Sequence, residues 1–182
     1  QKEGIKADWS FHQHGPQQQF GNYGLSFICN MSFYSELFTG TTLAFSQEQQ
    51  RILTSLLLEG YQWIIWRGYW DVNALNRQLF RNADIDKGFS LLFAAHSLMK
   101  SSEPEVADQI KKMILRNSSF SQVPNSFTGN KHFRESDYTV HRTPTWLASV
   151  RMASERVIGT ELVNEDNLKG YYMADGALYT YV

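Results

Sequence analysis

The sequence contains a single cysteine, and this scarcity excludes an intrachain disulfide. Cys29 lies in an apolar stretch, where we expect it to be buried as a small hydrophobic residue. No run approaches the roughly 18 apolar residues that a membrane-spanning helix needs, and no signal peptide is visible. The formal net charge is only −1, with 19% charged residues. This balance argues against a nucleic-acid-binding protein that works through bulk positive charge.

Aromatic residues, by contrast, are abundant, at 14% of the chain with five Trp and nine Tyr. Such rings fill a core or line a sugar-binding groove, and the core is the more frequent place for any single ring. The 182 residues, 42% of them apolar, suffice for one ordinary domain or parts of two. Because the chain begins at Gln1 rather than at a methionine and ends on a strand-like run, 178–182, we expect it to be cut from a longer protein.

Hydrophobic spacing in the first two thirds of the chain predicts helices. Apolar residues recur at steps of three and four over 25–37, and a capping-box pattern at Ser46–Gln49 opens a second helix that we expect to reach about Trp66. A third is expected over 86–99 and a fourth after Ser102, with Pro104 in its first turn. The expected side of the third helix comprises Phe89, Leu92, Phe93 and His96, and the buried stripe of the fourth comprises Val106, Ile110, Met113 and Ile114.

The pattern changes near residue 120. Residues 117–130 are rich in Ser, Asn, Pro and Gly and are typical of a linker. After it the period drops to two over 146–152, and 171–182 is aromatic and strand-like. Helices followed by strands predict two segregated parts rather than an α/β sheet.

The first motif with chemical potential spans residues 8–17 and continues over 21–24. His12 and His14 could be metal ligands, but no cysteine or carboxylate is suitably spaced nearby, which disfavours a metal. The motif could also be a polar loop that caps the next helix. In the catalytic interpretation His14 and Tyr23 converge on a substrate, since glycines at 15, 21 and 24 permit sharp turns and close backbone approach.

The second motif runs over 67–81 and contains Arg77 and Arg81. If both are helical, their spacing of four places them on one face. A solvated basic face is the usual explanation of such a pair, whereas two guanidinium groups could also bind an acidic sugar in bidentate fashion.

The third motif runs over 149–170 and contains Glu161 and Asn164. It could be an ordinary polar turn. Calcium is a lesser alternative, with oxygens from Glu161, Asn164, Glu165 and Asp166, although no EF-hand spacing is present.

Taken together, the motifs resemble, in the same order, the polysaccharide lyase family of chondroitin AC lyase, hyaluronate lyase and xanthan lyase. The resemblance covers nearly the whole chain and is specific because several spaced motifs agree. Between Arg67 and Asp71 the chain is one residue shorter than chondroitin AC lyase, which leaves the later spacing unaffected. The matching stretches are His14-Gly-Pro, Tyr23-Gly, Trp70-Asp with Arg77 and Arg81, Asp137-Tyr-Thr-Val-His-Arg142, Val150-Arg-Met-Ala-Ser-Glu-Arg156, Glu161 with Asn164-Glu-Asp-Asn167, Gly170-Tyr-Tyr172 and Asp175-Gly176.

The resemblance implies an α+β multidomain fragment. Residues 1–122 would be the C-terminal part of an incomplete α/α toroid carrying the His, Tyr and Arg site residues. Residues 123–182 would start an antiparallel β-sandwich domain carrying the Glu and Asn site residues. The composition break near residue 120 falls where that boundary should be.

The resemblance also implies β-elimination on a uronic-acid-containing glycan. Tyr23 would be the base and could reprotonate the leaving oxygen, with His14 assisting or sharing the base role; the sequence does not decide between them. Arg77 would favour the phenolate of Tyr23, and Arg81 would orient the substrate or support Tyr23. Asn164, held by Glu161, would bind the substrate carboxylate and stabilise the intermediate, as an oxyanion hole does. No cofactor or metal is implied.

Two other classes stay open: a non-catalytic carbohydrate-binding module that kept the lyase fold, and a glycoside hydrolase on a helical toroid. Hydrolysis is disfavoured because no water-activating carboxylate pair is evident. The expected partner is an acidic polysaccharide, without nucleic acid or a membrane span, and the expected location is secreted or periplasmic. The 182 residues alone are expected to be inactive and could self-associate through open sheet edges.

Overall fold

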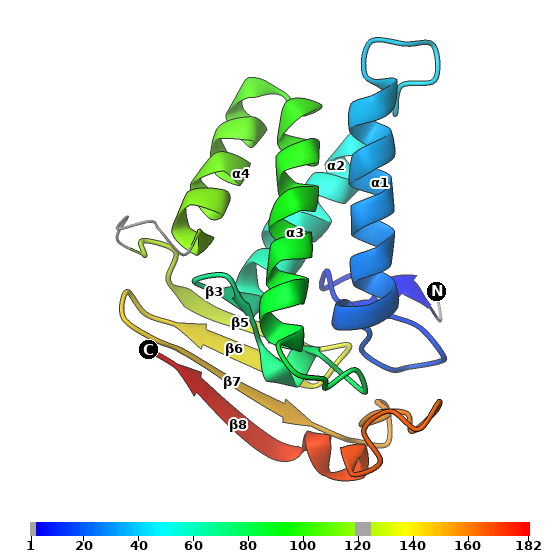
Figure 1. The fold of residues 1–182 in the computed structure, drawn as a ribbon, viewed down its shortest axis with the longest axis vertical. Coiled ribbons are helices and arrows are strands. Elements are labelled where there is room, and N and C mark those ends of the chain that lie inside the picture. Colours follow the sequence, from blue (N-terminus) through cyan, green and yellow to red (C-terminus); the bar gives the residue numbers. More distant parts are fainter. Residues whose placement is uncertain (1–2, 119–124) are drawn as a thin grey trace.

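The computed structural model describes residues 3–118 and 125–182, in which helices precede an antiparallel sheet (Figure 1). The α-helices are α1 (Leu25–Phe38), α2 (Gln47–Ser55), α3 (Ala83–Lys100) and α4 (Pro104–Asn117). The main sheet has the order β5-β6-β7-β8, formed by Gly129–Phe133, Tyr138–Arg142, Leu147–Met152 and Asp175–Tyr181. Two small antiparallel ladders, β1–β2 (Gly4–Ile5 with Phe11–His12) and β3–β4 (Ile65–Trp66 with Tyr69–Trp70), lie within the helical part. The α+β prediction is confirmed.

Helix α2 begins as predicted but ends earlier. Ser46 and Gln49 form the expected capping box. The α-helix stops at Ser55, and the chain continues as a π-helix (Leu56–Gly60) and a 3₁₀ turn (Tyr61–Ile64) before β3. The predicted helix to about Trp66 is therefore partly right: helical turns reach Ile64, but they are α-helical only to Ser55. At Gly60 a Cβ atom would lie 2.5 Å from the Trp9 carbonyl oxygen. This close approach of a distant segment is absent from the local hydrophobic pattern.

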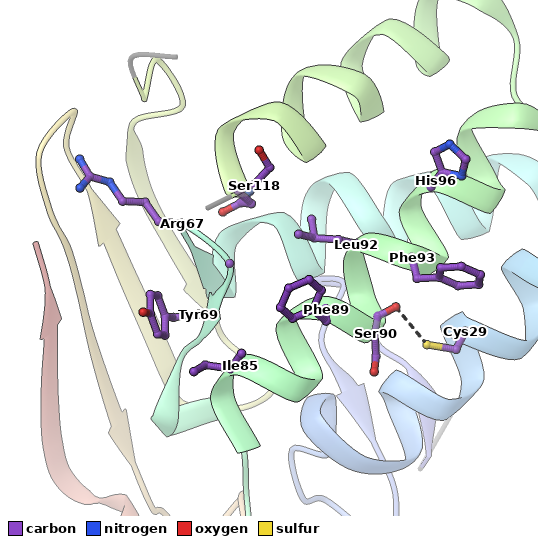
Figure 2. Close-up of a pocket in the computed structure, with 12 residues that line it drawn as sticks. Cys29, Arg67, Tyr69, Ile85, Phe89, Ser90, Leu92, Phe93, His96 and Ser118 are labelled. Atoms are coloured by element: carbon purple, nitrogen blue, oxygen red, sulfur yellow. Dashed lines mark hydrogen bonds between the residues drawn. The ribbon is translucent and has the colours of Figure 1, made fainter. Parts of the chain in front are cut away.

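Helix α3 starts three residues before the predicted Asp86, and the apolar side predicted for it is not covered by the core. Its core side consists of Leu91, Ala94, Ala95 and Leu98. Phe89, Leu92, Phe93 and His96 do gather on one side, but Phe89 is 66% and Phe93 74% exposed. They line an open, mainly apolar groove of about 810 Å³ (Figure 2). Cys29 lies at its edge, only partly buried, and donates to the Ser90 carbonyl oxygen at 3.6 Å. The prediction of a buried cysteine was therefore only partly right.

Helix α4 begins at Pro104, as predicted, and buries Ile110 and Met113, while Val106 and Ile114 pack against the core partly buried. The predicted Ser102 cap is wrong, because its hydroxyl donates to the Leu98 carbonyl oxygen at the end of α3. Of the predicted linker, 119–124 lie outside the described residues. Its last two residues, 129–130, begin β5.

The sheet turns an unusually polar face toward the helical part. In β7 the buried residues are Leu147, Ser149 and Arg151, whereas Trp146 before it and Met152 at its end are exposed. The predicted strand from Tyr171 begins only at Asp175, because 170–174 form a 3₁₀ turn. Sheet and helical part are joined by Asp71, which accepts hydrogen bonds from the hydroxyls of Tyr138 and Tyr181. Burial raises the pKa of this carboxyl.

Arg142 of β6 is a second link between the two parts. Its side chain is buried, and Nη1 lies 3.1, 3.0 and 2.8 Å from the carbonyl oxygens of Gln62, Trp63 and Ile65. The guanidinium also lies 5.2 Å from the Trp66 ring centroid. Burial lowers the pKa of Arg142 to about 9. The two hydrogens of Nη1 are thus shared among three carbonyls of the segment that follows α2.

We expect Arg142→Met to lower the free energy of unfolding by about 2–4 kcal/mol, since it leaves buried carbonyls without donors. Thermal or denaturant unfolding would measure the loss. Arg134→Met is the matched control, because Arg134 is exposed and forms a surface ion pair with its neighbour Glu135; a change within about 0.5 kcal/mol is expected there. Equal effects of the two substitutions would contradict the linking role of Arg142.

Candidate active site

His14 sits on a sharp turn of the segment before α1. Its φ is +60°, and Gly15 follows at φ +88°. The turn is tied to the far end of the chain, because the Ile158 amide donates to the Pro16 carbonyl oxygen at 2.9 Å and Gln17 forms an isolated parallel bridge with Ile158. The backbone therefore brings His14 next to the segment that follows β7.

Tyr23 is presented by a π-helix, Phe20–Gly24, that runs directly into α1. Phe20 and Asn22 of this turn are buried, whereas Tyr23 is exposed. A Cβ at Gly21 would lie 2.7 Å from the Ala74 carbonyl oxygen, and one at Gly24 would lie 2.6 Å from the Tyr61 hydroxyl. The two glycines allow the turn to pack closely on its neighbours, and π-turns inside helices are frequent at functional sites.

His14, Tyr23 and Arg77 meet at this point. The rings of His14 and Tyr23 are 4.8 Å apart between centroids and inclined at 63°. The Arg77 guanidinium carbon lies 5.8 Å from the Tyr23 ring centroid. The structure thus gathers three of the six candidate residues, from positions up to 63 residues apart in sequence.

Glu161 joins the group from the other side of the fold. One carboxylate oxygen lies 2.6 Å from Nδ1 of His14. The other forms an ion pair with Nη1 of Arg77 and accepts from the Gln19 amide at 3.1 Å. The side chains of Arg77 and Glu161 are only 7% and 14% exposed. Asp166 adds a longer contact to Nε of Arg77 at 3.4 Å. Because carboxylates already occupy the Arg77 guanidinium, it is less available to a substrate anion.

The remaining two candidate residues are Asn164 and Arg81. Both are exposed, and within residues 3–118 and 125–182 neither side chain forms a hydrogen bond or an ion pair. Asn164 is in the left-handed region at φ +57°, three residues after Glu161. The condition that Arg77 and Arg81 share a helical face is not met, because residues 77–81 form turns and irregular chain rather than a helix. Asn76 and Asn82, both at positive φ, flank this segment.

Sequence comparison assigns the chain to a family. The sequence model described as "Polysaccharide lyase family 8, N terminal alpha-helical domain" matches residues 1–116, and the one described as "Polysaccharide lyase family 8, super-sandwich domain" matches residues 128–182. The chain belongs to polysaccharide lyase family 8.

Relatives of this family 8 chain include chondroitinase-AC of Pedobacter heparinus, 31% identical over 179 residues that cover 97% of the chain and 25% of the relative. Hyaluronate lyase of Thermasporomyces composti is 25% identical over 208 residues, covering 97% and 27%. Among solved structures, Paenibacillus xanthan lyase superposes with a TM-score of 0.90 at 18% identity, covering 99% of the chain and 20% of that protein. A chondroitinase AC lyase–oligosaccharide complex has a TM-score of 0.82 at 26% identity, covering 98% and 26%. The chain therefore spans about a quarter of the length of the curated relatives it matches.

Sequence reasoning missed several polar residues beside the candidate site. Gln19 and Asn22 are buried beside Tyr23, and Gln78 and Lys87 approach the same turn from the other side. The run of glutamines at 17–19, all fully buried in the structure, is the sequence feature that could have indicated Gln19. Nothing in the sequence around Lys87 distinguishes it from an exposed helical lysine.

Across 3–118 and 125–182 there is no group of three or more His, Cys, Asp or Glu side chains placed to bind a metal ion. No helix within those ranges has the length and apolarity to span a bilayer.

Proposed function

We propose that this chain carries the catalytic site of a lyase that cleaves uronic-acid-containing glycans, of the chondroitin, hyaluronan or xanthan type, by β-elimination. The observation that carries the proposal is the contact of His14 with Tyr23 beside Arg77, with Glu161 bound to both His14 and Arg77. The names of its relatives, chondroitinase-AC, hyaluronate lyase and xanthan lyase, support it.

In this proposal Tyr23 is the base. Its ionised hydroxyl removes the proton from the carbon next to the uronate carboxylate. The electron pair forms a double bond to the neighbouring ring carbon as the bond from that carbon to the glycosidic oxygen breaks. The proton now on Tyr23 passes to the leaving oxygen, so the enzyme returns to its starting state. The Arg77 guanidinium lies beside the ring and, through its ion pair with Glu161, links Tyr23 to the acidic side of the site.

His14 has a defined orientation. When the neutral ring donates from Nδ1 to Glu161, its lone pair lies on Nε2, on the opposite side. That nitrogen can accept a hydrogen bond from the substrate or share the base role with Tyr23. Glu161 therefore determines both the direction and the tautomer of His14.

Asn164 and Arg81 are proposed to act on the substrate rather than on the other site residues. Asn164 has a side-chain amide free of partners within the described residues, which suits it to bind the uronate carboxylate as negative charge builds up. Its position three residues after Glu161 links it to the buried ion pair. Arg81, also exposed, is proposed to orient the acidic glycan.

The cheapest test is to incubate the complete gene product that contains this chain with chondroitin, hyaluronan and xanthan. We expect at least one of them to yield a product that absorbs in the near ultraviolet, because elimination creates a double bond conjugated to the carboxylate. Saturated ends without that absorbance would identify a hydrolase. Binding of the glycan without cleavage would identify a non-catalytic module. Either result would overturn the proposal.

Several expectations about the whole protein belong to the same proposal. We divide the chain into a toroid part, 1–122, and the start of a β-sandwich, 123–182. The 182 residues alone are proposed to be inactive, because binding energy from remote sugar units positions the reacting ring. Secretion to the exterior or periplasm is proposed because the polymer substrates are extracellular. Self-association is proposed through β8, the outer strand of the sheet, which carries exposed Leu178 and Tyr179.

A further inference from the structure

Lys87 of α3 is a buried cation whose hydrogen-bond partners are all neutral. Its residue is 7% exposed. The ammonium donates to the Gly21 carbonyl oxygen, to Oε1 of Gln78 at 2.8 Å and to Oδ1 of Asn22 at 3.5 Å. Within 3–118 and 125–182, no carboxylate forms an ion pair with it. An unpaired buried charge costs stability, so its retention calls for a reason other than packing.

The position of Lys87 suggests that reason. Gly21 and Asn22 belong to the π-helix that presents Tyr23. Lys87, Tyr23 and Arg77 line one small cavity of about 230 Å³. The three N–H groups of the ammonium match three acceptors, two of which lie in the turn that sets the direction of Tyr23.

A continuous polar chain runs from Lys87 to the ion pair of the site. Asn22, which accepts from Lys87, donates from Nδ2 to Oε1 of Gln19 at 2.9 Å. Gln19 in turn donates to Glu161 at 3.1 Å. Glu161 binds His14 and Arg77. A shift of Lys87 would therefore reach both sides of the site.

We propose that Lys87 is a positioning residue for Tyr23: its ammonium holds the Gly21–Asn22 part of the π-helix and, through Asn22 and Gln19, the Glu161 carboxylate. This inference rests on the proposed lyase function, in which Tyr23 is the base. Lys87 does not touch the reacting atoms in this scheme.

The charge state of Lys87 gives the inference a distinctive pH signature. Burial lowers the pKa of Lys87 from its ordinary 10.5 to about 8. Below pH 8 both the folded and unfolded states are protonated, and the cost of burial is fully present. Between pH 8 and 10.5 the folded state releases its proton first, so Lys87 contributes rising stability over that window. A neutral amine has only two hydrogens for three acceptors, so the positioning weakens over the same window.

Other groups that titrate or carry charge surround this lysine. Tyr23 of the π-helix and Arg77 share its cavity, and Asp84 and Asp86 lie in the first turn of its own helix. His14 and Glu161 stand at the far end of the polar chain. Each of them remains in place when Lys87 alone is changed, so a comparison of Lys87 variants isolates its contribution.

The test compares Lys87→Met with Lys100→Met in the complete gene product. Both lysines lie on α3, but Lys100 is exposed and pairs with Glu36 at the surface. For Lys87→Met we expect kcat to fall about 10- to 100-fold, the effect of a misplaced catalytic group, with KM within about threefold. Its melting temperature should change little, because removal of the buried charge offsets the loss of the donor to the Gly21 carbonyl oxygen. For Lys100→Met we expect wild-type kinetics.

Lys87→Arg tests the role of the charge, because a purely structural role of Lys87 would not change the pH dependence of kcat. Arginine stays protonated throughout, so the decline of wild-type kcat above about pH 8 should shift to higher pH in this variant, whatever its absolute rate. The inference is overturned if Lys87→Met retains wild-type kcat, or if the alkaline limb of Lys87→Arg coincides with that of the wild type. Should Lys87→Met not fold, the Lys87→Arg profile alone decides. Tyr23→Phe, assayed in parallel, separates the role of Lys87 from the proposed lyase function. If Tyr23→Phe loses turnover while Lys87→Met keeps wild-type kinetics, only the role of Lys87 is refuted.

Discussion

Tyr23→Phe in the complete gene product is expected to reduce kcat by about 10³-fold or more while the affinity for the glycan changes less than about threefold. General acid–base groups contribute on the order of 10²–10⁴-fold, and in our proposal this hydroxyl moves the proton twice. Phenylalanine keeps the aromatic ring, whose centroid lies 4.8 Å from that of His14 and which also lies beside Arg77. The loss should therefore appear in kcat measured by near-ultraviolet absorbance, and not in equilibrium binding.

Tyr34→Phe is the matched control for this substitution. Tyr34 is an exposed tyrosine of α1, away from the cluster that surrounds Tyr23, and its hydroxyl should be dispensable. Near wild-type turnover of Tyr23→Phe would discard Tyr23 as the base and transfer the role to His14, which already has its Nδ1 engaged by Glu161.

The second large effect is expected for Glu161→Gln. This substitution preserves the shape of the side chain but removes its negative charge and replaces one of its two acceptor oxygens with an NH2 donor. The side chain can then accept from His14 or from Arg77, but no longer from both. Breaking one partner of a buried ion pair costs about 3–5 kcal/mol, and we expect a loss of about 3 kcal/mol because Asp166 compensates in part. In addition, kcat should fall about 10²-fold or more through the displaced His14.

Unfolding and kinetic measurements on Glu161→Gln and on Glu165→Gln would check this prediction. Glu165 is a neighbouring, exposed carboxylate, so its exchange should change stability by less than about 0.5 kcal/mol. Arg77→Met combined with Glu161→Gln closes a double-mutant cycle, in which the double variant should be more stable than the sum of the single losses predicts. Additive losses would show that the two side chains do not act as a pair.

The parts of the fold that follow local rules could be predicted from the sequence. The capping box at Ser46, the proline that begins α4 and the apolar spacing of α1 depend on residues a few positions apart. The errors arose where distant segments meet. At Gly60 the Trp9 carbonyl oxygen occupies the space that a Cβ atom would need, and Arg142 supplies hydrogen bonds to the segment that follows. Periodicity also cannot distinguish a covered face from an open one, as Phe89 and Phe93 show.

The candidate site divides in the same way. His14, Tyr23, Arg77 and Glu161 could be singled out because their spacing resembles a known family, and the structure brings them together. Lys87, Asn22 and Gln19 could not. Their role depends on the hydrogen bonds that they form with distant segments of the fold. The local sequence around a lysine on a helix, or a glutamine in a run, does not indicate those partners.

The separation in sequence of the two halves of the site has a consequence for folding kinetics. The hydrogen bond between His14 and Glu161 closes a loop of 147 residues, and the Arg77–Asp166 contact closes one of 89. Contacts of such high sequence separation form slowly, because a long loop must be ordered before they stabilise it. Helices α1 to α4 rest on contacts within a few residues and can form first. The hydrogen bond that orients His14 is therefore among the last to appear, and a chain with native helix content can still lack a working site.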